Sequence, residues 1–499
     1  MLEKEFDIVI IGSGSGGGVV ASELSPMCRD GVRIAVLEWG PKLKPAEFTG
    51  REIEMVGRLY AEAGGFFTKD GDMTIAFGRA YGGSTVVYTG TSLKIAKETV
   101  EKWAVPGLEF DNMDRRAEKF FRENNLHLIE DSLINENNRL FVEGCRKLGY
   151  RTKRFPVNVK GCKGSSLCNL GCPHGAKQGT DQVQLPAAEK NGVLVVTNCK
   201  VEHLGNRECL AVVSEPGFGE PSAWAPGEYR IKAKIVVACG GAINTPALLI
   251  RSRLPAALPA LGKFITLHPA LILVGLHDRP IANFLGHPKS FCCDHFAGTH
   301  GFLLETCIYF PFTTAKSCIG FGAEHAELMA HMDRQQQIIA LAWDQPLERN
   351  RVTVDRKGDP VLDYRASPLV LDALHRAQIE AARIFFASGA ARVHAPAGRK
   401  FFVERSEAAE VEDLIPRSGM LPGKISLTSA HVMGGCRMGR DPETSVTDGW
   451  GRVHGVPWLY VADASLFPRC SEANPYLTIM ALADRVAERV RSDTSELLR

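Results

Sequence analysis

Three glycines near the start of the chain have the spacing that holds a dinucleotide. Gly12, Gly14 and Gly17 follow an apolar run at 8–11 in the pattern G-x-G-x-x-G. The first glycine permits a tight turn, the second lets a pyrophosphate approach the backbone, and the third lets a helix pack closely on the strand. Glu38, which ends the next apolar run, is placed to accept hydrogen bonds from ribose hydroxyls. The unit predicts a dinucleotide site, with a glycine-rich packing turn as the alternative, and leaves FAD and NAD open.

A second group of reactive side chains lies in a cysteine-rich loop. Cys162, Cys168 and Cys172 form the pattern C-x5-C-x3-C-P, with several glycines between them. Thiolates are soft ligands that select zinc or iron–sulfur clusters, and a final Cys-Pro is typical of bacterial ferredoxin runs. A structural zinc ion needs a fourth ligand, for which His174 is available. The residues themselves leave open an iron–sulfur cluster, a zinc ion and a metal-free loop.

Strands and helices that alternate along the chain must position these side chains. Residues 6–11 and 32–37 are predicted strands on either side of a helix, and residues 234–252 repeat the order of strand, Gly-Gly turn and helix. Residues 446–491 return to a strand and a helix, whereas the apolar segment 302–312 is interpreted as a core strand in preference to a pocket lining. Because nucleotide-binding signals occur near the start, middle and end, we expect a discontinuous dinucleotide domain with inserted pieces of a substrate domain.

The bulk composition excludes several classes of protein. A chain of 499 residues is longer than one core usually serves, and 45% hydrophobic with 23% charged residues is ordinary for a globular protein. A net charge of +2 provides no field for nucleic acid or an anionic membrane, and no apolar run is long enough to span a membrane. Fourteen cysteines behind an N-terminus without signal-peptide features favour reduced thiols or metal ligands. We therefore expect a cytoplasmic protein, unless it is exported with a partner.

Four sequence blocks resemble the glucose–methanol–choline (GMC) flavoprotein oxidoreductases. They are, in chain order, the glycine unit that ends at Glu38, GRAYGGST at 78–85, GAINTPALL at 241–249, and a C-terminal block made of HVMGGCRMG at 431–439, LYVADAS at 459–465 and NPYLT at 474–478. The blocks follow the order of the family along nearly the whole chain. Tyr88 departs from the family pattern, which usually has Asn at this place.

The resemblance implies an α/β fold with a Rossmann-like FAD-binding domain and a discontinuous α+β substrate domain. Residues 1–100, 160–264 and 421–499 are then expected to form the FAD-binding domain, which includes the cysteine loop. Residues 101–159 and 265–420 are expected to form the substrate-binding domain.

The resemblance also implies the oxidation of a C–OH group, with hydride passing to FAD. Such a reaction needs an acceptor for the hydroxyl proton, and histidine suits this role because its pKa lies near neutrality. By resemblance, His431 is the active-site histidine and Asn474 is the second active-site residue, whose amide hydrogen-bonds the substrate oxygen. The residues expected to bind FAD are Gly12, Gly14, Gly17, Glu38, Arg79, Gly82, Gly83, Ser84, Val201, Asp463 and Pro475. Asp463 is equally compatible with a helix cap, and His268 is expected to be structural.

The cysteine spacing is similar to that of the GMC catalytic subunit of bacterial FAD-dependent glucose dehydrogenases, which carries a three-iron cluster. This resemblance implies a [3Fe–4S] cluster ligated by Cys162, Cys168 and Cys172. A cluster passes electrons singly, so it would connect the flavin to a one-electron acceptor such as a cytochrome or a small partner subunit.

The main prediction is therefore a FAD-dependent alcohol dehydrogenase that uses an external acceptor. The alternative is an alcohol oxidase that uses O2 and produces hydrogen peroxide, with a structural cysteine loop. A non-catalytic electron-transfer module and a redox-neutral lyase are further alternatives. Sterols, lipid alcohols, sugars and aromatic alcohols all stay open as substrates.

Overall fold

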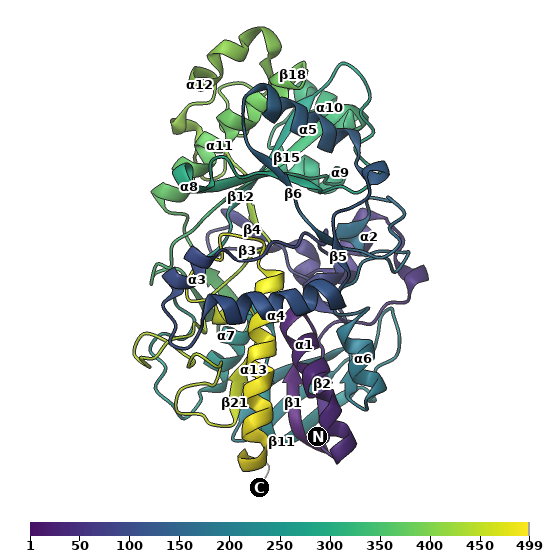
Figure 1. Cartoon of the computed structure of the whole chain (residues 1–499), viewed down its shortest axis with the longest axis vertical. Coiled ribbons are helices and arrows are strands. Elements are labelled where there is room, and N and C mark those ends of the chain that lie inside the picture. Colours follow the sequence, from purple (N-terminus) through teal and green to yellow (C-terminus); the bar gives the residue numbers. More distant parts are fainter. Residues whose placement is uncertain (498–499) are drawn as a thin grey trace.

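The chain folds into two halves, each built on its own β-sheet (Figure 1). The computed structural model describes residues 1–497. In the view of Figure 1 the lower half contains β1, β11 and the long helix α13, and the upper half contains β12, β15 and α11. No helix within residues 1–497 has both the length and the apolar run needed to cross a membrane.

The sheet of the lower half has the order β8-β2-β1-β11-β10-β9, with β21 also paired to β11. Its strands are β1 (Leu2–Ile11), β2 (Ile34–Leu37), β8 (Leu194–Val196), β9 (Cys199–Gly205), β10 (Glu208–Val213), β11 (Gly227–Ala238) and β21 (Leu459–Val461). Strands β8, β2, β1, β11 and β21 are parallel, whereas β9 and β10 form an antiparallel extension along the first half of β11. The apolar run of β1 is buried, as expected for a parallel strand covered on both faces.

Helices from distant parts of the chain gather in the lower half, either on this sheet or on the helices that cover it (Figure 1). They include α1 (Ser15–Leu24), α3 (Lys97–Trp103), α4 (Phe110–Glu123), α6 (Gln184–Lys190), α7 (Gly241–Ser252) and α13 (Tyr476–Leu497). Helix α13 packs against both α1 and α4, and α6 packs against α1. The helix that follows the N-terminal glycine turn and the C-terminal helix therefore pack against each other.

Helix α4 lies just beyond the expected domain boundary at residue 101 and packs with the lower half of the molecule. Met113, Ala117 and Phe120 of α4 are buried in the hydrophobic core of the lower half. The guanidinium of Arg116 also forms an ion pair with Asp484 of α13. By contrast, helix α5 (Glu136–Lys147) packs against α11 in the upper half. We therefore propose that the FAD-binding domain extends through α4 and that this stretch of the substrate domain begins beyond it.

The sheet of the upper half has the order β3-β4-β20-β12-β15-β14-β13-β6, with β18 paired to β12 and to β19. Its strands are β3 (Phe66–Phe67), β4 (Met73–Ile75), β6 (Thr152–Arg154), β12 (Ala270–Leu276), β13 (Phe291–Cys293), β14 (Phe302–Thr306), β15 (Gln335–Ala342), β18 (Arg392–His394), β19 (Val403–Glu404) and β20 (Leu427–Ser429). The central strands β12 and β15 are antiparallel and wholly buried.

Shorter elements surround the two sheets. They are the helices α2 (Glu52–Leu59), α8 (Ala297–His300), α9 (Pro311–Ser317), α10 (Ala323–Ala330), α11 (Pro368–Ala387) and α12 (Val411–Leu414), and the strand pairs β5 (Leu126–His127) with β7 (Val157–Asn158) and β16 (Arg351–Val354) with β17 (Pro360–Asp363).

Alternate residues of β12 and β15 face two different environments, because side chains of a strand alternate between the faces of its sheet. Leu271 and Ile338 belong to the core that packs against α11, whereas Ile272 and Leu341 line a cavity on the opposite face. The segment 302–312 divides in the same way. Its first part is the buried strand β14, as predicted, and its second part, with Tyr309, Phe310 and Phe312, lines the cavity.

Candidate active site

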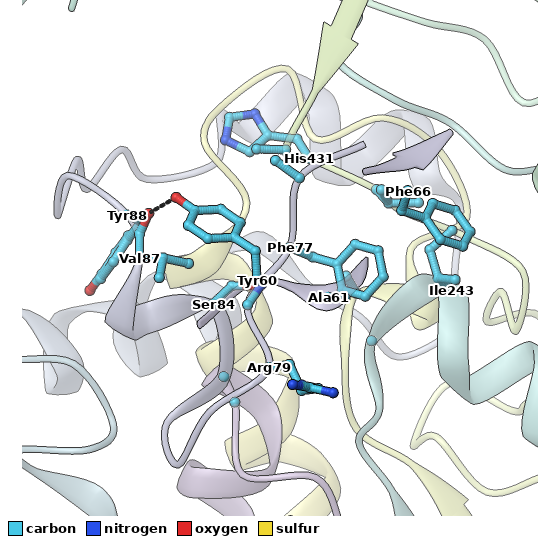
Figure 2. Close-up of a pocket in the computed structure, with 18 of the residues that line it drawn as sticks. Tyr60, Ala61, Phe66, Phe77, Arg79, Ser84, Val87, Tyr88, Ile243 and His431 are labelled. Atoms are coloured by element: carbon cyan, nitrogen blue, oxygen red, sulfur yellow. Dashed lines mark hydrogen bonds between the residues drawn. The ribbon is translucent and has the colours of Figure 1, made fainter. Parts of the chain in front are cut away.

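A cavity of about 710 Å³ lies between the two sheets, and residues from both halves line it. Figure 2 shows His431 at the top of this cavity and Arg79 well below it, with Tyr88 on one side and Ile243 on the other. Eleven of the thirteen residues predicted to bind FAD or to act in catalysis line the cavity. They are Gly12, Gly14, Glu38, Arg79, Gly83, Ser84, Val201, His431, Asp463, Asn474 and Pro475.

The two remaining glycines support the lining from behind. A Cβ atom at Gly17 would lie 1.9 Å from the carbonyl oxygen of Gly12, so only glycine allows α1 to approach the first turn. The backbone N–H of Gly82 donates to the Ser13 hydroxyl at 2.9 Å, which joins the second glycine block to the first. A Cβ atom at Gly83 would lie 2.7 Å from the Cα atom of Gly14. The close contact of these two backbones forms an open cradle without side chains at one end of the cavity.

Glu38 at the end of β2 holds this cradle in shape. Its carboxylate accepts hydrogen bonds from the N–H and hydroxyl of Ser13, at 2.9 and 2.6 Å, and from the N–H of Gly40, at 2.6 Å. Burial raises the pKa of the Glu38 carboxyl, while these three donors act in the opposite direction. Glu38 also lines the cavity. In dinucleotide-binding units the acidic residue at this position accepts hydrogen bonds from ribose hydroxyls.

Arg79 provides a buried donor that has no acceptor within residues 1–497. Its guanidinium lies over the Trp39 ring, 5.2 Å from the ring centroid, and its Nε is buried without a hydrogen-bond partner. Such an unsatisfied donor in a cavity wall suits an acceptor oxygen of a bound ligand. Together with the cradle and Glu38, Arg79 gives this end of the cavity the donors and the open backbone that a dinucleotide requires.

Asp463, which follows β21, combines the two roles that the sequence left open. Its carboxylate accepts hydrogen bonds from the N–H of Gly241 at 2.8 Å and from the Thr245 hydroxyl at 2.5 Å, both in α7. The other oxygen caps the next turn through the N–H of Ser465 at 2.7 Å. Asp463 is thus a helix cap and part of the cavity wall at once. Burial raises the pKa of its carboxyl.

His431 and Asn474 come from two different segments and meet at the same cavity. His431 lies shortly after β20, and Asn474 lies two residues before α13. The Asn474 side chain is 6% exposed, and its amide oxygen has no partner within the described chain. Burial, His268 and the ammonium of Lys289 together hold the pKa of His431 well below its usual range. The neutral imidazole is the form that accepts a proton, so this end of the cavity has a candidate base beside a free amide oxygen.

Comparison with known protein families identifies the chain. The N-terminal GMC oxidoreductase model matches residues 56–270, and the C-terminal GMC oxidoreductase model matches residues 346–483. The chain belongs to the GMC oxidoreductase family. Both matched segments include predicted site residues, and the family assignment made from the four sequence blocks is confirmed. The chain is therefore a flavoprotein oxidoreductase.

Individual relatives of this GMC oxidoreductase extend over nearly its whole length. An uncharacterized GMC-type oxidoreductase of Mycobacterium tuberculosis is 31% identical over 97% of this chain and 75% of the relative. A long-chain-alcohol oxidase of Arabidopsis thaliana is 27% identical over 97% of this chain and 66% of the relative. Among solved structures, pyridoxine 4-oxidase from Mesorbium loti has a TM-score of 0.71 at 19% identity, over 98% of this chain and 99% of the other. Formate oxidase has a TM-score of 0.72 at 14% identity over 100% of both chains. The predicted GMC-type fold is confirmed.

The cysteine loop of this GMC oxidoreductase does not have the arrangement expected for a metal cluster. Cys162, Cys168 and Cys172 are free, partly buried thiols. Across residues 1–497, no three side chains of His, Cys, Asp or Glu gather as metal ligands do. His174, the candidate fourth ligand for zinc, is exposed. The predicted [3Fe–4S] site is therefore not supported by the placement of its three cysteines.

The cysteine loop is connected to the cavity wall by hydrogen bonds. The buried ammonium of Lys177 donates to the carbonyls of Cys168 and Val86, both at 2.6 Å, and of Tyr88, at 2.9 Å. Asn169 of the loop contributes to the cavity lining, and its carbonyl accepts a hydrogen bond from the Tyr60 hydroxyl at 2.8 Å. The loop is thus tied to the segment after the second glycine block.

Sequence reasoning missed Lys289 and Glu305 of the upper half as functional candidates, and did not place Tyr88 in the cavity wall. Lys289 lines the cavity, and its ammonium lies 2.5 Å from a carboxylate oxygen of Glu305, which is fully buried. Neither residue belongs to a motif, and their pairing depends on neighbouring strands. Tyr88, noted only as a departure from the family, lines the cavity with its ring edge-on to Tyr476 at 5.0 Å.

Proposed function

We propose that this chain oxidises the C–OH group of an apolar alcohol and that FAD, held in the glycine cradle, accepts the hydride. His431 and Asn474 carry the proposal. A neutral imidazole and an amide oxygen without a partner line one cavity whose other end is an open dinucleotide cradle.

In this proposal the base, the residue that holds the substrate oxygen and the residues that hold the cofactor are different groups of the chain. FAD, when bound, supplies the hydride acceptor. His431 takes the hydroxyl proton at Nε2, because its Nδ1 is engaged with His268 at 2.9 Å. The Asn474 amide holds the reacting oxygen, and the cradle with Glu38 and Arg79 holds the dinucleotide.

The wall formed by the upper sheet favours an apolar substrate. Ala270 and Ile272 of β12, and Ile339 and Leu341 of β15, line the cavity from one face of the sheet. Aliphatic side chains of this kind favour burial of a hydrocarbon chain over binding of a sugar, which needs several hydrogen-bonding groups. The Arabidopsis relative, named a long-chain-alcohol oxidase, supports this choice of substrate class.

Molecular oxygen is the electron acceptor in this proposal. Within residues 1–497 the thiols of the cysteine loop do not form a group that could hold a metal relay, and the relatives named above with an activity, the long-chain-alcohol oxidase and pyridoxine 4-oxidase, are oxidases. The overall reaction of a primary alcohol with O2 then gives one aldehyde and one hydrogen peroxide. The external one-electron acceptor expected from the cysteine motif becomes the competing outcome.

The test uses the purified protein with bound FAD. Aliphatic primary alcohols of increasing chain length are compared with glucose, while aldehyde, oxygen consumption and hydrogen peroxide are measured. We expect activity with the aliphatic alcohols, one peroxide per aldehyde, and a loss of about 10²–10⁴-fold in kcat in His431→Gln with FAD retained. His300→Gln, which replaces an exposed histidine, is the matched control.

Two results would contradict the proposal. If no alcohol changes the absorbance of the bound flavin without oxygen, the assigned reaction is wrong. If iron analysis finds about three irons per chain and an artificial one-electron acceptor greatly outperforms O2, the assignment of O2 as electron acceptor is wrong. Electron transfer through a [3Fe–4S] cluster is then the supported route.

A further inference from the structure

Behind His431, two buried side chains continue a line of hydrogen bonds away from the cavity. The Nδ1 atoms of His431 and His268 are 2.9 Å apart, and Nε2 of His268 lies 2.9 Å from the sulfur of Cys470. His268 is 3% exposed and Cys470 is 4% exposed. The three residues come from three separate segments, so their alignment arises only in the folded chain.

The protons in this line have only two consistent arrangements. Burial lowers the pKa of His268 to about 3 and raises the pKa of Cys470 to about 12, so both side chains are neutral at pH 7. Two neutral rings that meet through their Nδ1 atoms share one proton between those atoms. If His431 holds that proton, its Nε2 is a free base. If His268 holds it, His431 carries its proton on Nε2 and cannot accept another.

The surroundings of Cys470 favour the first arrangement. Its sulfur lies 3.9 Å from the carbonyl oxygen of Leu267, an acceptor that only the S–H can satisfy. The other group within hydrogen-bond distance of the sulfur is Nε2 of His268, at 2.9 Å. With its own proton directed to Leu267, the sulfur accepts the Nε2–H of His268.

We propose that Cys470 and His268 are positioning residues that fix His431 in the tautomer with a proton on Nδ1 and a free Nε2. The chain of donors runs from His431 Nδ1–H to His268 Nδ1, from His268 Nε2–H to Cys470, and from Cys470 S–H to Leu267. The hydrogen bond on one ring nitrogen decides which nitrogen remains free, as in other catalytic histidines. The catalytic meaning of this tautomer rests on the proposed function.

Other titratable groups surround this line. Lys289 faces His431 from the cavity side, and Asp344, Tyr364 and Glu472 lie around Cys470. The Tyr364 hydroxyl donates to the Asp344 carboxylate at 2.9 Å, so that carboxylate already has a donor of its own. The tautomer should therefore be measured directly as well as through pH profiles.

The decisive measurement is a long-range proton–nitrogen NMR correlation on FAD-bound protein with ¹⁵N-labelled histidine. The His431 signals are assigned by their loss in His431→Gln. We expect protonated Nδ1 and unprotonated Nε2 in the native protein. The opposite tautomer overturns the proposal, whether or not any alcohol is oxidised, whereas an inactive protein with the expected tautomer contradicts the proposed function alone.

Variants of Cys470 extend the test to catalysis. Cys470→Ser keeps a donor and an acceptor, so we expect the tautomer and kcat to be preserved within about threefold. Cys470→Ala removes the acceptor, and we expect mixed tautomers and a fall in kcat of about 10- to 100-fold with little change in KM. Cys209→Ala, at a buried thiol in β10, is the matched control.

Unchanged tautomer and kcat in Cys470→Ala would overturn the proposal. If Cys470→Ala does not fold, His268→Gln gives the same test from the middle of the line, and the spectrum of the native protein decides in either case.

Discussion

The ammonium of Lys289, a residue that lines the same cavity as His431, lies 2.5 Å from the carboxylate of Glu305. Glu305 is fully buried, and one of its two oxygens lies away from the ion pair without a donor. A buried carboxylate is costly unless a cation compensates it. The pair thus introduces a positive charge near the candidate base, where it contributes to the low pKa of His431.

Removal of Lys289 alone should destabilise the protein more than removal of the whole pair. Lys289→Met leaves the Glu305 carboxylate buried and uncompensated, which should lower the free energy of unfolding by about 3–5 kcal/mol. The double variant Lys289→Met/Glu305→Gln has no charge left to compensate and should recover much of that loss. Urea unfolding of both variants measures the difference, and equal losses would show that the pair is not coupled.

Glu38 should control how tightly FAD is held. Glu38→Gln replaces one acceptor oxygen by an NH2 group, which then faces an N–H donor of Ser13 or Gly40. The substitution also replaces an ionised acceptor for the ribose hydroxyls by a neutral amide, and loss of such a hydrogen bond costs about 1–3 kcal/mol, so we expect FAD to bind about 5- to 150-fold more weakly. Fluorescence titration of the FAD-free protein measures the Kd. Glu3→Gln, at an exposed position of β1, should leave the Kd unchanged.

Lys177 should determine how firmly the cysteine loop is held. Lys177→Met leaves three carbonyls without their donor, those of Val86, Tyr88 and Cys168. We expect a loss of stability of about 2–4 kcal/mol and faster reaction of Cys168 with a thiol reagent. Mass spectrometry of the labelled peptides measures the rate at each cysteine. Lys163→Met, at an exposed position of the same loop, is the control, and equal rates in both variants would contradict this role of Lys177.

The site residues that the sequence predicted lie either in one short segment with its own geometry or in blocks that resemble those of the family. Gly12, Gly14 and Glu38 lie in one short unit whose geometry follows from its own residues. The blocks that contain His431 and Asn474 were recognisable because their residues resemble those of the GMC family. Both residues line the cavity that the glycine cradle also forms. Their roles in catalysis remain predictions that the variants above test.

What the sequence did not reveal depends on contacts between distant segments. Cys470 and His268 are 202 residues apart in the chain, so nothing local to either residue indicates their contact. Asp463 accepts a hydrogen bond from Gly241, 222 residues away. The proposed extension of the FAD-binding domain through α4 could not be read from the sequence either, because the amphipathic pattern of this helix does not say which of two cores its apolar face joins. The spacing of the cysteine motif suggested metal ligands, whereas within residues 1–497 the three thiols do not form a group that could hold a metal ion.

Buried neutral histidines should make the stability of the protein depend on pH, and His394 isolates this effect outside the active site. Its Nδ1 is 3.0 Å from the Phe401 carbonyl, its Nε2 has no partner within the described chain, and burial lowers its pKa to about 4. Between pH 4 and about 6.5 the unfolded chain binds a proton that the folded chain does not, so the free energy of unfolding falls as the pH falls. From pH 7 to pH 5 this residue should account for about 2 kcal/mol of that loss.

His394→Gln keeps a donor for Phe401 and removes the titration, so its unfolding free energy should fall by about 2 kcal/mol less than that of the native protein over the same interval. Asp181 and Asp344, whose pKa values burial raises to about 6, act in the opposite direction. They are present in both proteins, so their effect cancels in the comparison. Urea unfolding at pH 5, 6 and 7 measures the slopes, with His300→Gln at an exposed site as the control. Parallel pH profiles for the native protein and His394→Gln would mean that His394 is protonated in the folded state and that burial does not suppress its charge.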